Sequence, residues 1–238
     1  MMLDELSILL AHVTNQYAEK DEYRFAICDS NCLGKRSGKT RTLTYRHLVD
    51  IYSLDFKNVI FRALLYFWNR DLYGRSLIAM LCAYARDAVF RSTSHFILNF
   101  PEGAIITRES LEAFIDRQDP GRFSKATLKS TAQNINSTWT KSGHVCGRVR
   151  KVRSRANPTA GSVSYALLLG YLTGVRGQAL FQTEYAKLLD CTADKAIELA
   201  EDASRKGWII FKRVGDVIEV LFPNLINTSE LEWLREQN

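Results

Sequence analysis

The chain has 238 residues, of which 46% are hydrophobic and 24% charged, and its formal net charge is +6. These proportions are typical of a globular protein. A membrane-spanning protein is excluded, because the longest apolar run covers nine residues, Leu77 to Ala85, where roughly 20 are needed. Four prolines and thirteen glycines leave little room for linkers, so we expect helix to dominate.

The cysteines and the first residues indicate the compartment. Five cysteines, an odd number scattered along the chain, are typical of a reducing environment. The first ten residues carry Asp4 and Glu5 and no basic segment, unlike a secretory signal. We therefore expect a cytoplasmic protein that does not associate with a membrane.

The first fifty residues predict mixed local structure. Residues 3–19 favour a short amphipathic helix, and the stretch from Tyr23 to Cys28 favours a strand. Residues 31–49 are basic and contain no acid until Asp50. Glycines and a serine predict a loop in the first half of this basic stretch, and the residues that follow are only weakly helical in pattern.

Residues 56–103 predict a helical core. From Phe56 onward, apolar side chains recur at steps of three and four, which is the period of a helix with one buried face. The segment from Asp71 to Gly74 interrupts the pattern. A second long helix is predicted after it, and Pro101 and Gly103 end this half of the chain.

Residues 104–156 follow a different order. Thr107 can cap a helix over 108–118, and Ser124 can cap a second helix over 125–141. Gly143 ends that helix, and an extended basic segment follows. Helix, turn, helix, glycine and strand is the order of a winged helix-turn-helix, so we predict such a module here.

The same order recurs in residues 162–238. Helices are predicted over 164–172, 183–189 and 193–206, followed by strands over 208–214 and 216–222. The polar segment 157–161, with Pro158 and Gly161, is the best candidate for a boundary between the two modules.

The predicted fold class is therefore mainly α, a helical core with two winged helix-turn-helix modules and short β-hairpin wings. We predict three domains: residues 1–103 with the basic loop and the helical core, residues 104–156 with the central module and its basic arm, and residues 162–238 with the C-terminal winged helix.

Positive charge is concentrated in the central module. From Arg122 to Arg155 there is no Asp or Glu, and the exposed positions of the second helix are polar and short. Such a patch attracts a polyanion, and amide side chains on a helix can reach base edges in the major groove. The candidate DNA-contacting residues are Arg122, Lys125, Lys129, Gln133, Asn134, Lys141, Arg148, Arg150, Lys151, Arg153 and Arg155, with Lys35, Arg36, Lys39 and Arg41 as a second contact.

The third helix of the C-terminal module has the opposite charge. Asp194, Glu198, Glu201 and Asp202 outnumber the basic residues there, so a phosphate backbone would repel this helix. We expect that the C-terminal module docks to protein or has a structural role.

Other chemistries fit the sequence less well. The stretch Gly34 to Thr40 has three residues between its glycines, whereas a P-loop has four. Cys28 and Cys32 lack the second close pair that a tetrahedral zinc site needs. Without a nucleophile signature or paired carboxylates, we expect no enzyme, no cofactor and no metal.

The order of these segments resembles a known family. Two long apolar helices lead into Ser124-Lys125-Ala126-Thr127-Leu128-Lys129 and Gln133-Asn134, then a glycine, a basic stretch and a C-terminal winged element. This pattern, over roughly residues 56–222, resembles the BrxA family of bacteriophage-exclusion (BREX) defence systems. The resemblance implies a non-enzymatic protein that binds double-stranded DNA beside other phage-defence subunits.

We therefore expect double-stranded DNA binding, largely through phosphates, within a BREX-type system. Two alternatives stay open. One is a transcriptional or replication regulator that reads a specific operator, and the other is an RNA-binding factor or protein adaptor.

Overall fold

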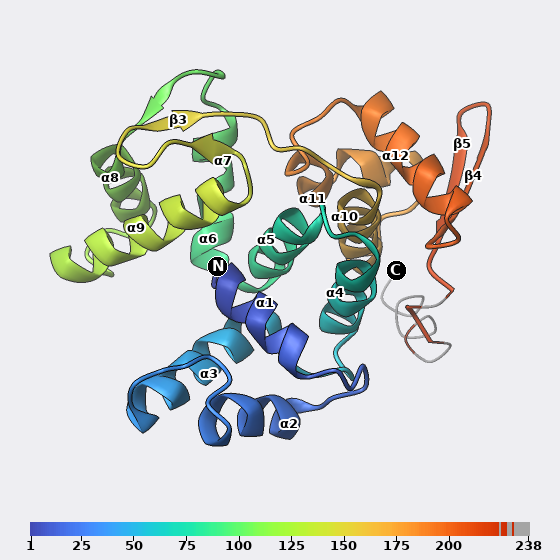
Figure 1. Ribbon diagram of the computed structural model, residues 1–238. Helices are drawn as coiled ribbons and strands as arrows, with labels where there is room; N and C mark the ends of the chain where they lie inside the picture. Colours follow the sequence, from blue (N-terminus) through green and yellow to red (C-terminus); the bar gives the residue numbers. More distant parts are fainter. Residues whose placement is uncertain (224, 228–229, 231–238) are drawn as a thin grey trace.

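Helices α4 (Val59–Arg70), α5 (Arg75–Arg86) and α10 (Ala160–Leu172) lie at the centre of the computed structural model (Figure 1). The structure describes residues 1–223, 225–227 and 230. Nearly every residue of α10 is buried, and the helix packs against both α4 and α5. The Tyr165 hydroxyl donates a hydrogen bond of 3.0 Å to the carbonyl oxygen of Ile60, which fixes α10 against α4. The prediction of a mainly α fold is confirmed.

A buried carboxylate attaches the start of α10 to the turn between α4 and α5. Asp71 accepts hydrogen bonds from the backbone amides of Gly74, at 3.0 Å, and Gly161, at 2.8 Å. A Cβ on Gly161 would lie only 2.6 Å from Asp71 Oδ2, so the close approach needs glycine. Helix α10, which follows the predicted boundary at 157–161, packs against helices that come before this segment in the chain and against helices that come after it.

The N-terminal segments differ from two predictions. The predicted strand from Tyr23 to Cys28 is wrong, because helix α2 (Lys20–Arg24) runs directly into a π-helix (Phe25–Asp29). The residues buried there, Tyr23, Ala26 and Ile27, are three and four positions apart, which suits a helix. The first helix, α1 (Leu3–His12), is shorter than predicted.

The basic stretch is more helical than its sequence indicates. Helix α3 (Gly38–Tyr52) begins directly after Ser37, whose Oγ accepts a hydrogen bond from the Thr40 amide. Thr44, Leu48 and Tyr52 are buried at steps of four, so packing stabilises a segment with weak intrinsic preference.

The second long helix of the core is divided. After α5, Asp87 caps a separate short helix by accepting a hydrogen bond of 3.0 Å from the Phe90 amide. The two short helices that follow are α6 (Ala88–Ser92) and α7 (Ser94–Leu98). The indole of Trp139 donates to Thr93 Oγ1 at 3.2 Å, so these helices hold the next module against the core.

The central module has two helices and a small antiparallel sheet. Helices α8 (Arg108–Gln118) and α9 (Lys125–Lys141) have the predicted bounds, with Thr107 and Ser124 as their caps. The sheet has the order β1-β3-β2, with Ile105 paired to Val152 and Val145 paired to Arg153. Its strands are β1 (Ile105–Ile106), β2 (Val145–Cys146) and β3 (Lys151–Arg153).

The C-terminal segment also has the predicted elements, with a 3₁₀ turn in addition. A two-stranded antiparallel sheet projects beside helix α12 (Figure 1). The last residues of the predicted third domain, 231–238, lie outside the described residues. The elements are the 3₁₀ helix Gly177–Gln182, α11 (Glu184–Lys187), α12 (Ala193–Arg205), β4 (Ile210–Val214) and β5 (Val217–Leu221).

Candidate nucleic-acid interface

Helix α9 has one buried face and one polar face. Ala132, Ile135 and Trp139 pack inward, while Lys125, Lys129 and most of the short polar side chains face solvent. The helix begins at Ser124, whose Oγ accepts a hydrogen bond of 3.2 Å from the Thr127 amide. The sequence pattern therefore places a polar helix face without acids on the surface.

A groove of about 770 Å³ separates α9 from the connection between β2 and β3. We call residues 147–150, which form this connection, the wing. The α9 side of the groove carries amides, hydroxyls and an ammonium group, and the wing side carries two guanidinium groups. Residues at the start of α8 also line the groove. The lining residues are Ile105, Ile106, Thr107, Arg108, Glu109, Gln133, Asn136, Ser137, Thr140, Lys141, Arg148, Val149, Arg150 and Lys151.

The wing is a tight turn that depends on one glycine. Gly147 has a φ of +92°, and a Cβ there would lie 2.0 Å from the carbonyl oxygen of Arg150. The turn exposes Arg148, Val149 and Arg150, and Val149 is 95% exposed. The chain thus presents an apolar side chain between two cations at the edge of the groove.

Four of the predicted contact residues are exposed cations without an internal partner. The side chains of Lys125 and Lys129 on α9, and of Arg148 and Arg150 on the wing, form no hydrogen bond or ion pair with any described residue. Glu109 lines the groove, and its pKa is lowered by its own backbone hydrogen bond, by Arg108 and, to a smaller extent, by the charge of Lys129. Arg108 neutralises this acid through a contact of 2.6 Å.

Four other predicted contacts already have partners in the protein. These partners compete with phosphate but do not bury the cations, so each could exchange one contact for another. Arg122 lies 3.6 Å from Asp119, Lys141 lies 2.6 Å from Asp4, Arg155 lies 3.1 Å from Glu102, and Lys151 donates to Thr140 Oγ1 and to the Gly147 carbonyl oxygen.

Arg153 does not belong to this surface, which corrects its prediction as a phosphate contact. Its side chain is 5% exposed, and it makes a two-point ion pair with Asp190, with N–O distances of 2.8 and 2.9 Å. It also donates to the carbonyl oxygens of His144 and Ser154. Lys151 and Arg153 share one face of β3. That face is partly exposed at Lys151 and covered at Arg153, so only Arg153 is buried. The arginine connects the central module to the turn before α12.

The two neighbouring amides of α9 lie on different sides. Gln133 lines the groove, whereas Asn134 lines a separate cavity of about 550 Å³ together with Met1 and His47 of α3. Successive helix positions are about 100° apart, so adjacent residues cannot serve one narrow site equally. Gln133 therefore lines the groove, and Asn134 does not.

The second basic stretch is separate from the groove. Arg36 and Lys39 are exposed, while Lys35 pairs with Glu5 at 3.0 Å and Arg41 donates to the Cys28 carbonyl oxygen at 2.9 Å. No residue of this stretch lines the groove. The helix that begins at Gly38 follows helical residues rather than a strand, so the context of a P-loop is missing.

Some groove residues were not among the predicted contacts. Asn136, Ser137 and Thr140 lie with Gln133 at positions i, i+3, i+4 and i+7, which share one helix face. That spacing was readable from the sequence. The contribution of Thr107 and Arg108 was not, because it depends on how α8 packs against α9.

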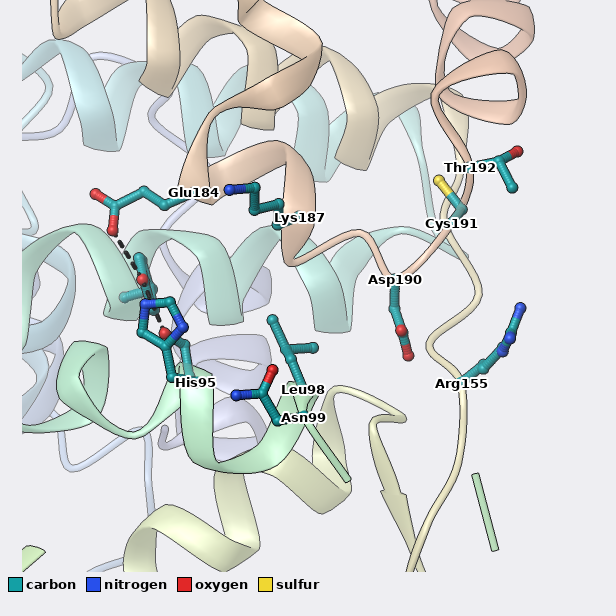
Figure 2. A pocket seen from close by; sticks show the side chains of 11 residues that line it. His95, Leu98, Asn99, Arg155, Glu184, Lys187, Asp190, Cys191 and Thr192 are labelled. Atoms are coloured by element: carbon teal, nitrogen blue, oxygen red, sulfur yellow. Dashed lines mark hydrogen bonds between the residues drawn. The ribbon is translucent and has the colours of Figure 1, made fainter. Parts of the chain in front are cut away.

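Another cavity, of about 620 Å³, lies between α7 and α11 (Figure 2). Tyr84 donates to Glu184 Oε2 at 2.9 Å and shares a hydrogen bond with Ser94. His95 and Cys191 lie at opposite sides of this view, and burial raises the pKa of the Cys191 thiol. The cavity therefore does not bring a cysteine and a histidine together as a nucleophile and its base.

His144, directly before β2, is fully buried. Burial lowers its pKa to about 4, against the opposing effects of Asp190 and of the Leu188 carbonyl oxygen. In the neutral ring, Nε2–H donates to that carbonyl at 2.9 Å, and Nδ1 accepts from the Ser142 hydroxyl at 2.8 Å.

We expect acid to destabilise the protein through His144. Since the unfolded imidazole binds a proton near pH 6.5 and the folded one only near pH 4, the stability contributed by the neutral ring is present above pH 6.5. It is lost as the pH falls towards 4, by about 3 kcal/mol in total. Urea unfolding of the wild type and of His144→Gln across this range measures it, and an equal decline in both would contradict the assignment.

The cations of α12 are paired within their own module. Lys195 lies 2.9 Å from Glu198, and Arg205 and Lys206 both contact Asp202. This helix therefore presents compensated charge, in contrast to α9.

Comparison of the chain with protein families, with curated proteins and with solved structures finds no match. Within the described residues, none of the helices combines the length and the apolar character that crossing a membrane requires.

Proposed function

We propose that the protein binds double-stranded DNA without catalysing a reaction, with α9 and the wing as its contact surface. The observation that carries the proposal is a set of four exposed cations. Arg148 and Arg150 line the polar groove, and Lys125 and Lys129 are exposed on α9, the helix that lines its other side. Cations that have no partner among the described residues gain the most from phosphates, because they give up no internal ion pair.

The order of elements supports the same proposal. Helix α7, strand β1, helices α8 and α9, and strands β2 and β3 follow one another, and the sheet has the order β1-β3-β2. This is the order of a winged helix-turn-helix, in which the last helix enters the major groove and the hairpin contacts the backbone. We infer that α9 is the groove-entering helix.

The resemblance to the BrxA family extends the proposal to a role in a BREX-type phage defence system. In that role the C-terminal module, whose α12 cations are paired internally, contacts other defence subunits rather than DNA.

Binding to unrelated duplexes tests the proposal. We expect fluorescence anisotropy to give similar affinities for duplexes of different sequence, with dissociation constants around 10⁻⁴–10⁻⁶ M near physiological salt. The reason is that phosphate contacts carry no sequence information. Single-stranded DNA and duplex RNA serve as comparisons.

Three results would contradict this proposal. Absence of binding removes it entirely, a thousand-fold preference for one sequence favours an operator-binding regulator, and far tighter binding of RNA favours an RNA-binding factor.

A further inference from the structure

One lysine connects the wing to helix α9. The ammonium group of Lys151, the first residue of β3, donates to Thr140 Oγ1 on α9 at 3.0 Å and to the carbonyl oxygen of Gly147 at 2.7 Å. Thr140 Oγ1 in turn donates to the carbonyl oxygen of Asn136 at 2.7 Å. A chain of hydrogen bonds therefore runs from the wing through one side chain to the backbone of α9.

The partners of Lys151 differ from those of the other paired cations on this surface. Arg122, Lys141 and Arg155 each contact an acid, whereas Lys151 bonds two uncharged oxygens on two different elements. Hydrogen bonds from an ammonium group are roughly twice as strong as those between neutral groups. Turning this ammonium towards a phosphate would break both of them and release the wing from α9.

The tip of the wing has few other supports. The paired residues of β2 and β3 end at Cys146 and Val152, and the backbone of residues 148–150 makes no hydrogen bond to another described residue. The side chain of Val149 is 95% exposed, so packing does not fix the tip either. The position of the tip relative to α9 therefore depends on Lys151.

A fixed wing changes the affinity for DNA in a characteristic way. If the wing moved freely, Arg148 and Arg150 would have to be ordered when they meet phosphates, and this ordering costs affinity. The number of phosphates contacted in the complex would stay the same, and that number sets the salt slope. Holding the wing in place thus raises the affinity without changing the slope.

We propose that Lys151 is a positioning residue, which holds Arg148 and Arg150 in place relative to α9 through Thr140 and does not itself contact phosphate. This inference rests on the proposed function, since it concerns how the wing is prepared for DNA. It replaces the expectation that Lys151 is one of the phosphate contacts.

The variant Thr140→Val tests the proposal without changing any charge. Valine has nearly the shape of threonine but lacks the oxygen that Lys151 bonds. We expect the affinity for a duplex, measured by fluorescence anisotropy, to fall about tenfold at every salt concentration, which is the scale of ordering two freed side chains on binding. The slope of log affinity against log salt should stay unchanged.

Lys151→Met removes the other partner of the same hydrogen bond. It should weaken binding by a similar factor, again without a change of slope. The double variant should bind no more weakly than Lys151→Met alone, because two substitutions that remove one interaction are not additive. Thr42→Val on α3 is the matched control, since Thr42 Oγ1 also donates to the carbonyl oxygen four residues earlier but lies outside the groove. It should change neither the affinity nor the slope.

Trypsin measures the wing in the absence of DNA. Cleavage after the exposed Arg148 requires the tip to leave its folded position, so its rate reports local opening. We expect cleavage there to be about tenfold faster in Thr140→Val and Lys151→Met than in the wild type, on the same scale as the loss of affinity. The rate in Thr42→Val should equal that of the wild type.

The outcomes separate this proposal from duplex binding itself. A slope lower by about 0.9 in Lys151→Met would show that Lys151 contacts phosphate, and the positioning role would be wrong. The same conclusion follows if Thr140→Val binds DNA as tightly as the wild type or more tightly, or if trypsin cleaves all the proteins equally fast. If none of the proteins binds DNA, the proposed function is wrong, and the cleavage rates still decide whether Lys151 holds the wing.

Discussion

Replacing Lys125, Lys129, Arg148 and Arg150 together by alanine should lower the salt dependence of DNA binding severely. Each lost phosphate contact reduces the slope of log affinity against log salt by about 0.9, so the expected reduction is about 3 to 4. Most of the affinity near physiological salt should disappear with it. The four side chains are exposed and have no partner among the described residues, so the fold should survive.

A matched control removes the same charge elsewhere. Four surface cations of the C-terminal module have acidic partners in the same module. They are Lys195 and Arg205 on α12, Lys206 directly after α12, and Lys212 on β4. Their replacement by alanine changes the net charge equally and should reduce the slope by less than about one contact. Equal reductions of the slope in the two variants would show that DNA binding depends on the net charge of the protein. That result would contradict α9 and the wing as the contact surface.

Arg153→Ala should be the most destabilising of the arginine substitutions in the central module. Removing one partner of a buried ion pair leaves Asp190 uncompensated, at a cost of about 3–5 kcal/mol in the free energy of unfolding. Arg155→Ala, which removes an exposed pair with Glu102, should cost about 1 kcal/mol or less. Urea denaturation of the two variants measures the difference.

A double variant separates folding from binding. Replacing Arg153 by Met and Asp190 by Asn removes both charges. Asparagine tolerates the positive φ of +55° at position 190 and keeps an oxygen that can accept from the Ala156 amide. This protein should be more stable than Arg153→Ala and should bind DNA with the same salt slope as the wild type. If the slope falls by about 0.9 in this folded variant, Arg153 contacts phosphate after all.

The sequence predicted the elements of the central module well, because local chemistry specifies them. Thr107 and Ser124 are strong caps, and the apolar spacing of α9 is regular. The sequence failed where tertiary packing decided the outcome. Tyr23 to Cys28 has strand-forming residues but buries one helical face, and the segment after Ser37 becomes a helix because Leu48 and Tyr52 pack into the core.

In the candidate site, too, some residues can be predicted from local sequence and others only from tertiary packing. Exposed cations such as Lys129 and Arg148 could be selected from charge pattern alone. Arg153 could not be separated from them, because its partner Asp190 is 37 residues away in the sequence. The burial of Asn136 likewise depends on tertiary packing.

The pairing of Arg153 with Asp190 also has an evolutionary consequence. A lineage that loses either residue alone passes through a protein with an uncompensated charge in its interior, and selection acts against that intermediate. Inheritance should therefore keep the two residues together or exchange both for uncharged residues, with asparagine or glycine favoured at the positive φ of position 190. The exposed cations of the wing have no such ion pair with a second position, so mutation can shift them along the turn while the positive charge of this surface is kept.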